Sequence, residues 1–249
     1  AWVAALPEVA EGTWHFRQLF VDGKRRSRPR FPREGLFRMA DVPGMPLPAG
    51  WQGGGYTQFA CADGDVAPYR NLSDIEVVYV HFWIEERSPI ASFEAETNMV
   101  TMARESRTCL VGSHGSQLAD YYLDNVFEAM TEPGDWYLDR EKGDLYYLPL
   151  PGETPETTEV FAPRALQLLR LSGRPERDEF VEHVRFHGLT FQHTDWRHPG
   201  ENEAASLDAF TLPSGMRLSR GNHAAAGQAA SDVPGIVNLR GGRNCAIEE

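Results

Sequence analysis

Short runs of alternating apolar and polar residues, closed by glycine, proline, asparagine or aspartate, recur along most of this 249-residue chain. Alternation at a period of two places every second side chain on the same face of a β-strand, and the closing residues favour tight turns. Residues 121–130 are the one stretch that predicts a short helix. We therefore expect an all-β protein.

The first part of the chain predicts antiparallel hairpins. Residues 16–21 read as a strand that ends at Asp22-Gly23, a dipeptide that accepts the positive φ of a tight turn. Residues 75–82 are rich in valine, isoleucine and tyrosine, and Trp83-Ile84 is expected to extend them as one buried strand. Two further pairs of runs predict hairpins: residues 90–93 with 99–102, and residues 136–139 with 145–148.

The sequence pattern changes after residues 151–153. The runs become short strands interrupted by glycine or asparagine and joined by loops of very unequal length: residues 168–173, 181–191, 235–241 and 244–247. This pattern is typical of stacked coils in a β-helix, where alternate side chains fill a narrow interior. A β-sandwich produces similar runs, so the spacing alone leaves both architectures open.

Composition excludes several classes of partner. The net charge of −12 disfavours nucleic acid and anionic lipid surfaces, and no apolar run approaches the roughly 18 residues of a membrane span. Cys61, Cys109 and Cys245 lack metal-ligand spacing, and no nucleophile elbow, phosphate loop or zinc-protease motif is present. We expect neither a metal nor another cofactor.

Three blocks, in order, carry a resemblance to a known family: residues 14–25 with 28–32, residues 125–128 with 132–139, and residues 184–196. In these blocks the chain resembles right-handed parallel β-helix repeat proteins grouped with glycoside hydrolase families 120 and 141. The resemblance implies pectin lyase-like rungs over residues 164–249 and an inserted antiparallel β-sandwich-like domain over residues 1–163. It also implies further rungs before Ala1 and after Glu249, which pack on this piece, and favours a secreted or periplasmic protein.

The tetrad His193-Thr194-Asp195-Trp196 is the strongest sequence candidate for a sugar-binding site. An indole face stacks on a sugar ring, while imidazole and carboxylate groups bond its hydroxyls. Gln228, at the start of the next rung, is expected beside them, and Asp195 is a weak catalytic candidate. The alternative is structural: Trp196 covers the rungs, His193 is a satisfied structural residue, and Asp195 caps a turn.

A second candidate site is the basic run from Lys24 to Arg30, in which Arg28 and Arg30 are expected to hold a uronate-bearing glycan. The alternative is that these arginines pair with local carboxylates or dock the insertion onto the rungs. Likewise, the aromatic residues at 136, 137, 146 and 147 form either a sugar-binding strip or cross-strand core pairs.

Together these observations predict a fragment of a glycoside hydrolase that cleaves plant or microbial polysaccharides with paired carboxylates. Most of those carboxylates are expected beyond Glu249, which would leave this chain inactive by itself. Two alternatives stay open: a polysaccharide lyase, and a non-catalytic glycan-binding or surface β-helix protein.

Overall fold

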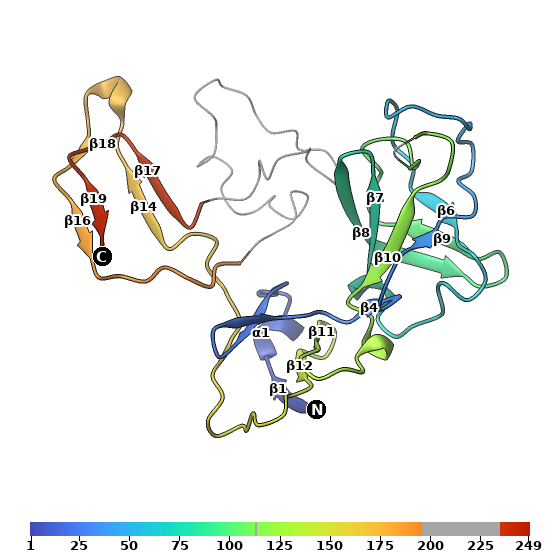
Figure 1. The fold of residues 1–249 in the computed structure, drawn as a ribbon, viewed down its shortest axis with the longest axis horizontal. Helices are drawn as coiled ribbons and strands as arrows, with labels where there is room; N and C mark the ends of the chain where they lie inside the picture. Colours follow the sequence, from blue (N-terminus) through green and yellow to red (C-terminus); the bar gives the residue numbers. More distant parts are fainter. Residues whose placement is uncertain (113, 196–234) are drawn as a thin grey trace.

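The computed structural model describes residues 1–112, 114–195 and 235–249. Strands dominate and helix is almost absent, so the all-β prediction is confirmed (Figure 1). The helical elements in these ranges are short: α1 (Pro7–Ala10) and the 3₁₀ turns η1 (Leu72–Asp74), η2 (Phe127–Ala129) and η3 (Pro175–Arg177). None of the described helices is long and apolar enough to cross a membrane.

The central feature is a seven-stranded antiparallel sheet. Its path runs β4 (Arg30–Phe31), β10 (Asp120–Asp124), β7 (Glu76–His81), β8 (Ile84–Glu94), β9 (Met99–Met102) and β6 (Gln58–Ala60), and β5 (Phe37–Arg38) also pairs with β10. The predicted hairpin between residues 90–93 and 99–102 is confirmed by the β8–β9 pairing.

Two smaller antiparallel sheets complete the first part of the chain. One joins β1 (Trp2–Ala5), β12 (Asp144–Tyr147) and β11 (Trp136–Asp139), and the other joins β13 (Val160–Phe161), β2 (Leu19–Val21) and β3 (Lys24–Arg26). The turn predicted at Asp22-Gly23 is present with positive φ, and the predicted hairpin of residues 136–139 with 145–148 is confirmed by the β11–β12 pairing, with Gly143 at positive φ in its turn.

Side-chain alternation on the large sheet separates a core from a polar face. Val77, Tyr79, Tyr121 and Leu123 are fully buried in one apolar cluster. The neighbouring positions, including Tyr122, point to the opposite face, because successive strand side chains alternate.

The second apolar cluster lies under the β1–β12–β11 sheet. Trp136 and Tyr147 belong to it, Phe16 stacks on Trp136 with ring centroids 5.6 Å apart, and Tyr137 is fully buried. The structure therefore favours the core interpretation for these aromatic residues over a sugar-binding strip.

Two sequence predictions in this part are wrong. Residues 121–130 do not form a helix: β10 ends at Asp124, Asn125 takes a left-handed conformation with φ +65°, and η2 follows. Pairing with β7 on one side and with β4 and β5 on the other stabilises the strand instead.

The predicted single strand through residue 84 is also wrong. His81 pairs with Ile84, so Phe82 and Trp83 form a two-residue hairpin turn between β7 and β8. No glycine, asparagine or aspartate marks this turn, which is why the sequence did not reveal it.

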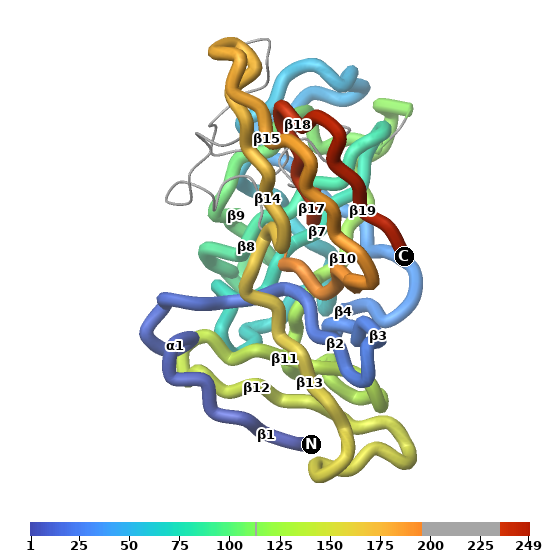
Figure 2. Tube along the Cα trace, turned by 90° about the vertical axis from the view of Figure 1, so that its left-hand side faces the viewer, coloured from blue at the N-terminus to red at the C-terminus, as the bar shows by residue number. Residues whose placement is uncertain are grey.

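The last part of the described chain pairs in parallel, as predicted. The three pairs are β14 (Leu169–Ser172) with β17 (Val237–Arg240), β15 (Val181–Glu182) with β18 (Gly242–Arg243), and β16 (Arg185–His187) with β19 (Ala246–Glu248). Figure 1 shows these strands side by side, apart from the large antiparallel sheet, and Figure 2 shows them from another direction.

Candidate functional site

A cleft of about 980 Å³ brings together segments that lie far apart in the sequence. The cleft is lined by β2, β3 and β4 with the residues around them and by residues 192–195, which contact β2. Residues of β8 and β10 form its floor. Four of the six residues predicted to bind substrate line it: Arg28, Arg30, His193 and Asp195. The other two, Trp196 and Gln228, lie outside the described residues.

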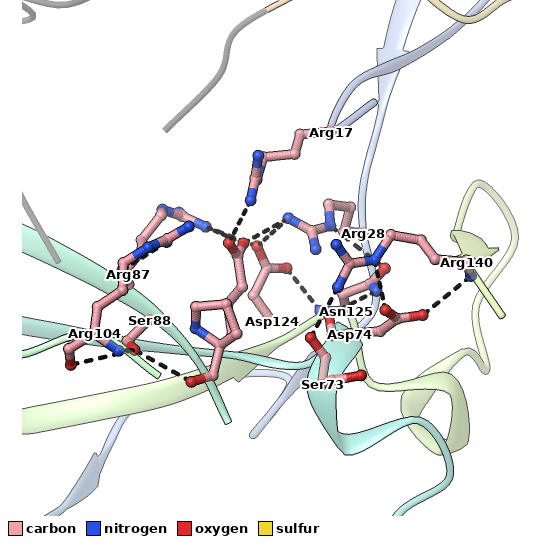
Figure 3. Close-up of polar contacts among 12 residues, drawn as sticks. Arg17, Arg28, Ser73, Asp74, Arg87, Ser88, Arg104, Asp124, Asn125 and Arg140 are labelled. Carbon is pink, nitrogen blue, oxygen red and sulfur yellow. Dashed lines mark hydrogen bonds and ion pairs between the residues drawn. The ribbon is translucent and has the colours of Figure 1, made fainter. Parts of the chain in front are cut away.

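Two carboxylates and three guanidinium groups meet beside the cleft (Figure 3). Glu76 Oε1 accepts a hydrogen bond from Arg17 Nη2 at 2.9 Å, and its Oε2 accepts one from Arg28 Nη1 at 3.0 Å. Asp124 Oδ2 accepts from Arg28 Nη1 at 3.1 Å and from Arg87 Nη1 at 2.8 Å. The register of β10 on β7 sets Asp124 opposite Glu76, so one arginine bridges both carboxylates.

Electrostatics keep Glu76 and Arg87 charged. Burial alone would raise the pKa of Glu76, but the guanidinium groups of Arg17, Arg28 and Arg87 lower it well below its ordinary value. Burial opposes the charged form of Arg87 as well, yet Asp124 and Glu85 raise its pKa further above the ordinary value. Glu76 therefore stays ionised and is a poor proton donor.

His193 and Asp195 lie on a wall of the cleft that packs against β2. The His193 ring packs between Phe20, at a centroid distance of 4.3 Å, and Phe161, at 5.2 Å. Asp195 is buried, and its backbone N–H donates to the carbonyl oxygen of Ala165 at 2.9 Å. The carbonyl of Thr194 accepts from Gln18 Nε2 at 3.2 Å, which ties this wall to the antiparallel part.

The two predicted arginines are used differently. Arg28 forms ion pairs with Glu76 and Asp124, so local pairing, the alternative role, describes this residue. Arg30 donates from Nε to the carbonyl of Pro32 at 3.0 Å and lies 4.0 Å above the centre of the Tyr122 ring. Its partners are neutral, so its positive charge remains uncompensated by a carboxylate among the described residues.

Sequence reasoning missed Arg17, Glu76, Arg87 and Asp124. Glu76 opens an otherwise apolar strand and Asp124 closes another, which was the available signal for a buried polar site. Their adjacency depends on the β7–β10 register, which no local pattern specifies. As a whole, the site offers charged and hydrogen-bonding groups on its floor and an aromatic, carboxylate-bearing wall, an arrangement suited to binding a polar ligand.

The comparisons with known proteins bear on the fold. No protein-family model matches the chain, and no curated protein matches it in sequence. A solved structure described as "Glycoside hydrolase" superposes with a TM-score of 0.58 at 25% identity, over 80% of this chain and 35% of that one. The chain thus spans about a third of the length of that protein and has an all-β, glycoside hydrolase-like fold.

Proposed function

We propose that this chain is part of a carbohydrate-active β-helix protein that hydrolyses glycosidic bonds of plant or microbial polysaccharides. In this proposal residues 164–249 are rungs of a right-handed, pectin lyase-like helix, and residues 1–163 are an inserted antiparallel domain. The likeness to a structure described as a glycoside hydrolase supports the activity.

The order of the parallel pairs is the single observation that carries the proposal. Three consecutive strands, β14, β15 and β16, pair with the next three in the same order. Two stacked coils of a β-helix produce this pattern, and parallel crossovers are right-handed in nearly all proteins. His183 and Asn244 support the stacking, because both take a left-handed conformation, φ +58° and +53°, at the equivalent bend of each coil.

The cleft is the proposed glycan-binding surface. His193 and Asp195 provide an aromatic edge and a carboxylate, the groups that contact sugar rings and hydroxyls. Arg30 provides hydrogen-bond donors for sugar oxygens. Arg28 provides the N–H groups that do not bond Glu76 or Asp124. Glu76 is held ionised by arginines, so it does not supply the proton that a leaving group needs. The catalytic acid is therefore sought elsewhere in the complete protein, with Asp195 as the candidate carboxylate in this chain.

Hydrolysis assays on the protein expressed from its complete reading frame test the proposal. Xylan, pectin and fucosylated xyloglucan are offered, with new reducing ends and the ultraviolet absorbance of unsaturated sugars as readouts. We expect reducing ends without unsaturated products, and no turnover by residues 1–249 alone. Unsaturated products would identify a lyase instead, and binding without any cleavage would identify a glycan-binding protein.

Asp195→Asn then tests the one candidate carboxylate in this chain, with Glu11→Gln at an exposed position near α1 as the matched control. If Asp195 contacts substrate, the variant weakens binding or turnover while the control does not. Equal activity of both variants and the unmodified protein would remove Asp195 from the site.

A further inference from the structure

Two tryptophans lie exposed at one end of the large sheet, outside the residues that line the cleft. Trp83 is 53% exposed and Trp51 is 49% exposed, and their ring centroids are 5.7 Å apart with the planes tilted by 60°. Exposed indoles lose the favourable burial that large aromatic side chains normally gain in a folded protein. Two of them in contact on the surface therefore point to a use outside the fold.

The turn that carries Trp83 also holds a second aromatic residue, in a strained backbone conformation. Phe82 precedes it with φ +50°, in a two-residue hairpin turn where glycine, asparagine or aspartate is usual. A bulky residue in this conformation is an outlier, and such outliers gather at functional sites. The sequence thus keeps Phe82 and Trp83 at the tip of the β7–β8 hairpin although the backbone there favours smaller residues.

A buried polar network holds the two tryptophan-bearing segments together. His81 Nε2 and Glu86 Oε1 are 2.7 Å apart, with both side chains fully buried at the base of the hairpin. His81 Nδ1 contacts the carbonyl oxygen of Cys109 at 3.0 Å, and Glu86 Oε2 accepts from the backbone N–H of Arg107 at 2.8 Å. Cys109 Sγ in turn donates to the carbonyl of Gln52 at 3.0 Å, next to Trp51.

Close packing and further backbone bonds fix the loop of Trp51. A Cβ added at Gly54 would meet the carbonyl oxygen of Arg107 at 2.5 Å, so only glycine fits where this loop crosses the 106–109 segment. On either side of Trp51, Ala49 N–H donates to the Gly115 carbonyl and Gly55 N–H donates to the Ser106 carbonyl. These contacts hold the backbone segments that carry the two indoles next to each other.

The pair also lies close to the cleft along β8. Glu85, near the start of β8, lines the cleft, and Trp83 precedes it by two residues in the turn. A glycan that occupies the cleft and extends past Glu85 would therefore approach the turn that carries Trp83.

We propose that Trp51 and Trp83 form a stacking platform for the apolar faces of pyranose rings, an additional subsite for a glycan that also occupies the cleft. The choice of a sugar as ligand rests on the proposed function. Two tilted indoles offer room for one or two rings, whereas a protein partner needs an interface of about 1,000 Å² or more. The platform extends recognition beyond the cleft and favours long chains over short ones.

The test uses the full-length protein labelled with 5-fluorotryptophan, with the fluorine signals assigned through Trp51→Phe and Trp83→Phe. Hexasaccharides and disaccharides prepared from xylan, homogalacturonan and xyloglucan serve as probes. We expect a hexasaccharide that binds to shift both signals. Trp51→Ala and Trp83→Ala should each lower the affinity for that hexasaccharide about tenfold, because one ring contact is lost. The affinity for the corresponding disaccharide should change by less than about twofold.

Leu47→Ala is the matched control, because Leu47 is also 49% exposed but is not an aromatic residue. Melting temperatures show that each variant is folded. If a hexasaccharide binds without shifting either fluorine signal, and both alanine variants bind it with unchanged affinity, the platform is refuted and the proposed function stands. If none of these saccharides binds and none of the polysaccharides is cleaved, the proposed function fails, and the platform fails with it.

Discussion

The antiparallel and parallel parts of this molecule contain the same types of apolar residue but bury them to different extents. In β7 five of six residues are buried, and apolar side chains fill the space on one side of the sheet. In β14 and β17, and in the other parallel pairs, the described strands contain no buried apolar side chain, and Leu239 and Ile247 are about half exposed. Among the described residues each of these parallel sheets has two strands, too few to cover its faces.

Charged pairs differ in the same way. Glu76 is almost fully buried among three arginines, whereas Arg185 and Glu248 pair at 3.4 Å across β16 and β19 with side chains that are 72% and 45% exposed. Removing one partner of a buried pair leaves an uncompensated charge, but an exposed pair is solvated either way. The contrast between the two parts is therefore energetic and measurable.

The largest expected difference concerns apolar burial. Phe59→Ala empties a fully buried position in the first core and should cost about 3–5 kcal/mol of unfolding free energy. Phe186→Ala, at a half-buried position in β16, should cost about 1–2 kcal/mol. Urea unfolding of both variants checks the comparison, and equal losses would contradict it.

The buried carboxylate should make the antiparallel part sensitive to acid. The pKa of Glu76 is lower in the folded protein than its ordinary value of 4.5, so its stabilisation is present above that pH and is lost as the pH falls below it. Glu76→Gln should cost about 2–3 kcal/mol at neutral pH and flatten the acid dependence of stability below about pH 4.5. Unfolding measured from pH 7 to pH 3 tests this, and an unchanged acid profile would show that other carboxylates dominate.

Both parts contain a residue in the left-handed conformation, phenylalanine in one and asparagine in the other, and exchanging the two residue types tests the cost of this conformation. Phe82→Asn should stabilise the β7–β8 turn by about 1 kcal/mol, because asparagine adopts positive φ more readily than phenylalanine. Asn244→Phe should destabilise the bend between β18 and β19 by a similar amount, about 1 kcal/mol. Thermal unfolding of each variant is the measurement. A destabilised Phe82→Asn would mean that packing of Phe82 outweighs its backbone strain.

The smallest effect is expected at the exposed ion pair. Glu248→Gln should change the unfolding free energy by less than about 0.5 kcal/mol and should not alter its pH dependence. Salt titration of the unmodified protein and the variant provides the check. A loss above about 1 kcal/mol would show that the pair is far less solvated than its exposure indicates.

The all-β class, the hairpin at Asp22-Gly23 and the parallel pairing of the later strands were predictable from the sequence. The first two depend on local information: alternation at a period of two and turn residues that accept positive φ. The change in loop length and glycine content after residue 153 fitted a β-helix or a β-sandwich, and the parallel pairing was expected from the family resemblance. The sequence also singled out Arg28, Arg30, His193 and Asp195, which the fold places in one cleft.

Other features depend on contacts between distant segments. Phe82 and Trp83 form a turn because β7 and β8 pair around them and bury His81 with Glu86, against the local preference of the two aromatic residues. Arg17 reaches Glu76 over 59 positions in the sequence, and Arg87 reaches Asp124 over 37. Strand register and chain crossing set such distances, and neither is encoded in a run of neighbouring residues, so the tertiary structure alone decided the charged floor and the tryptophan pair.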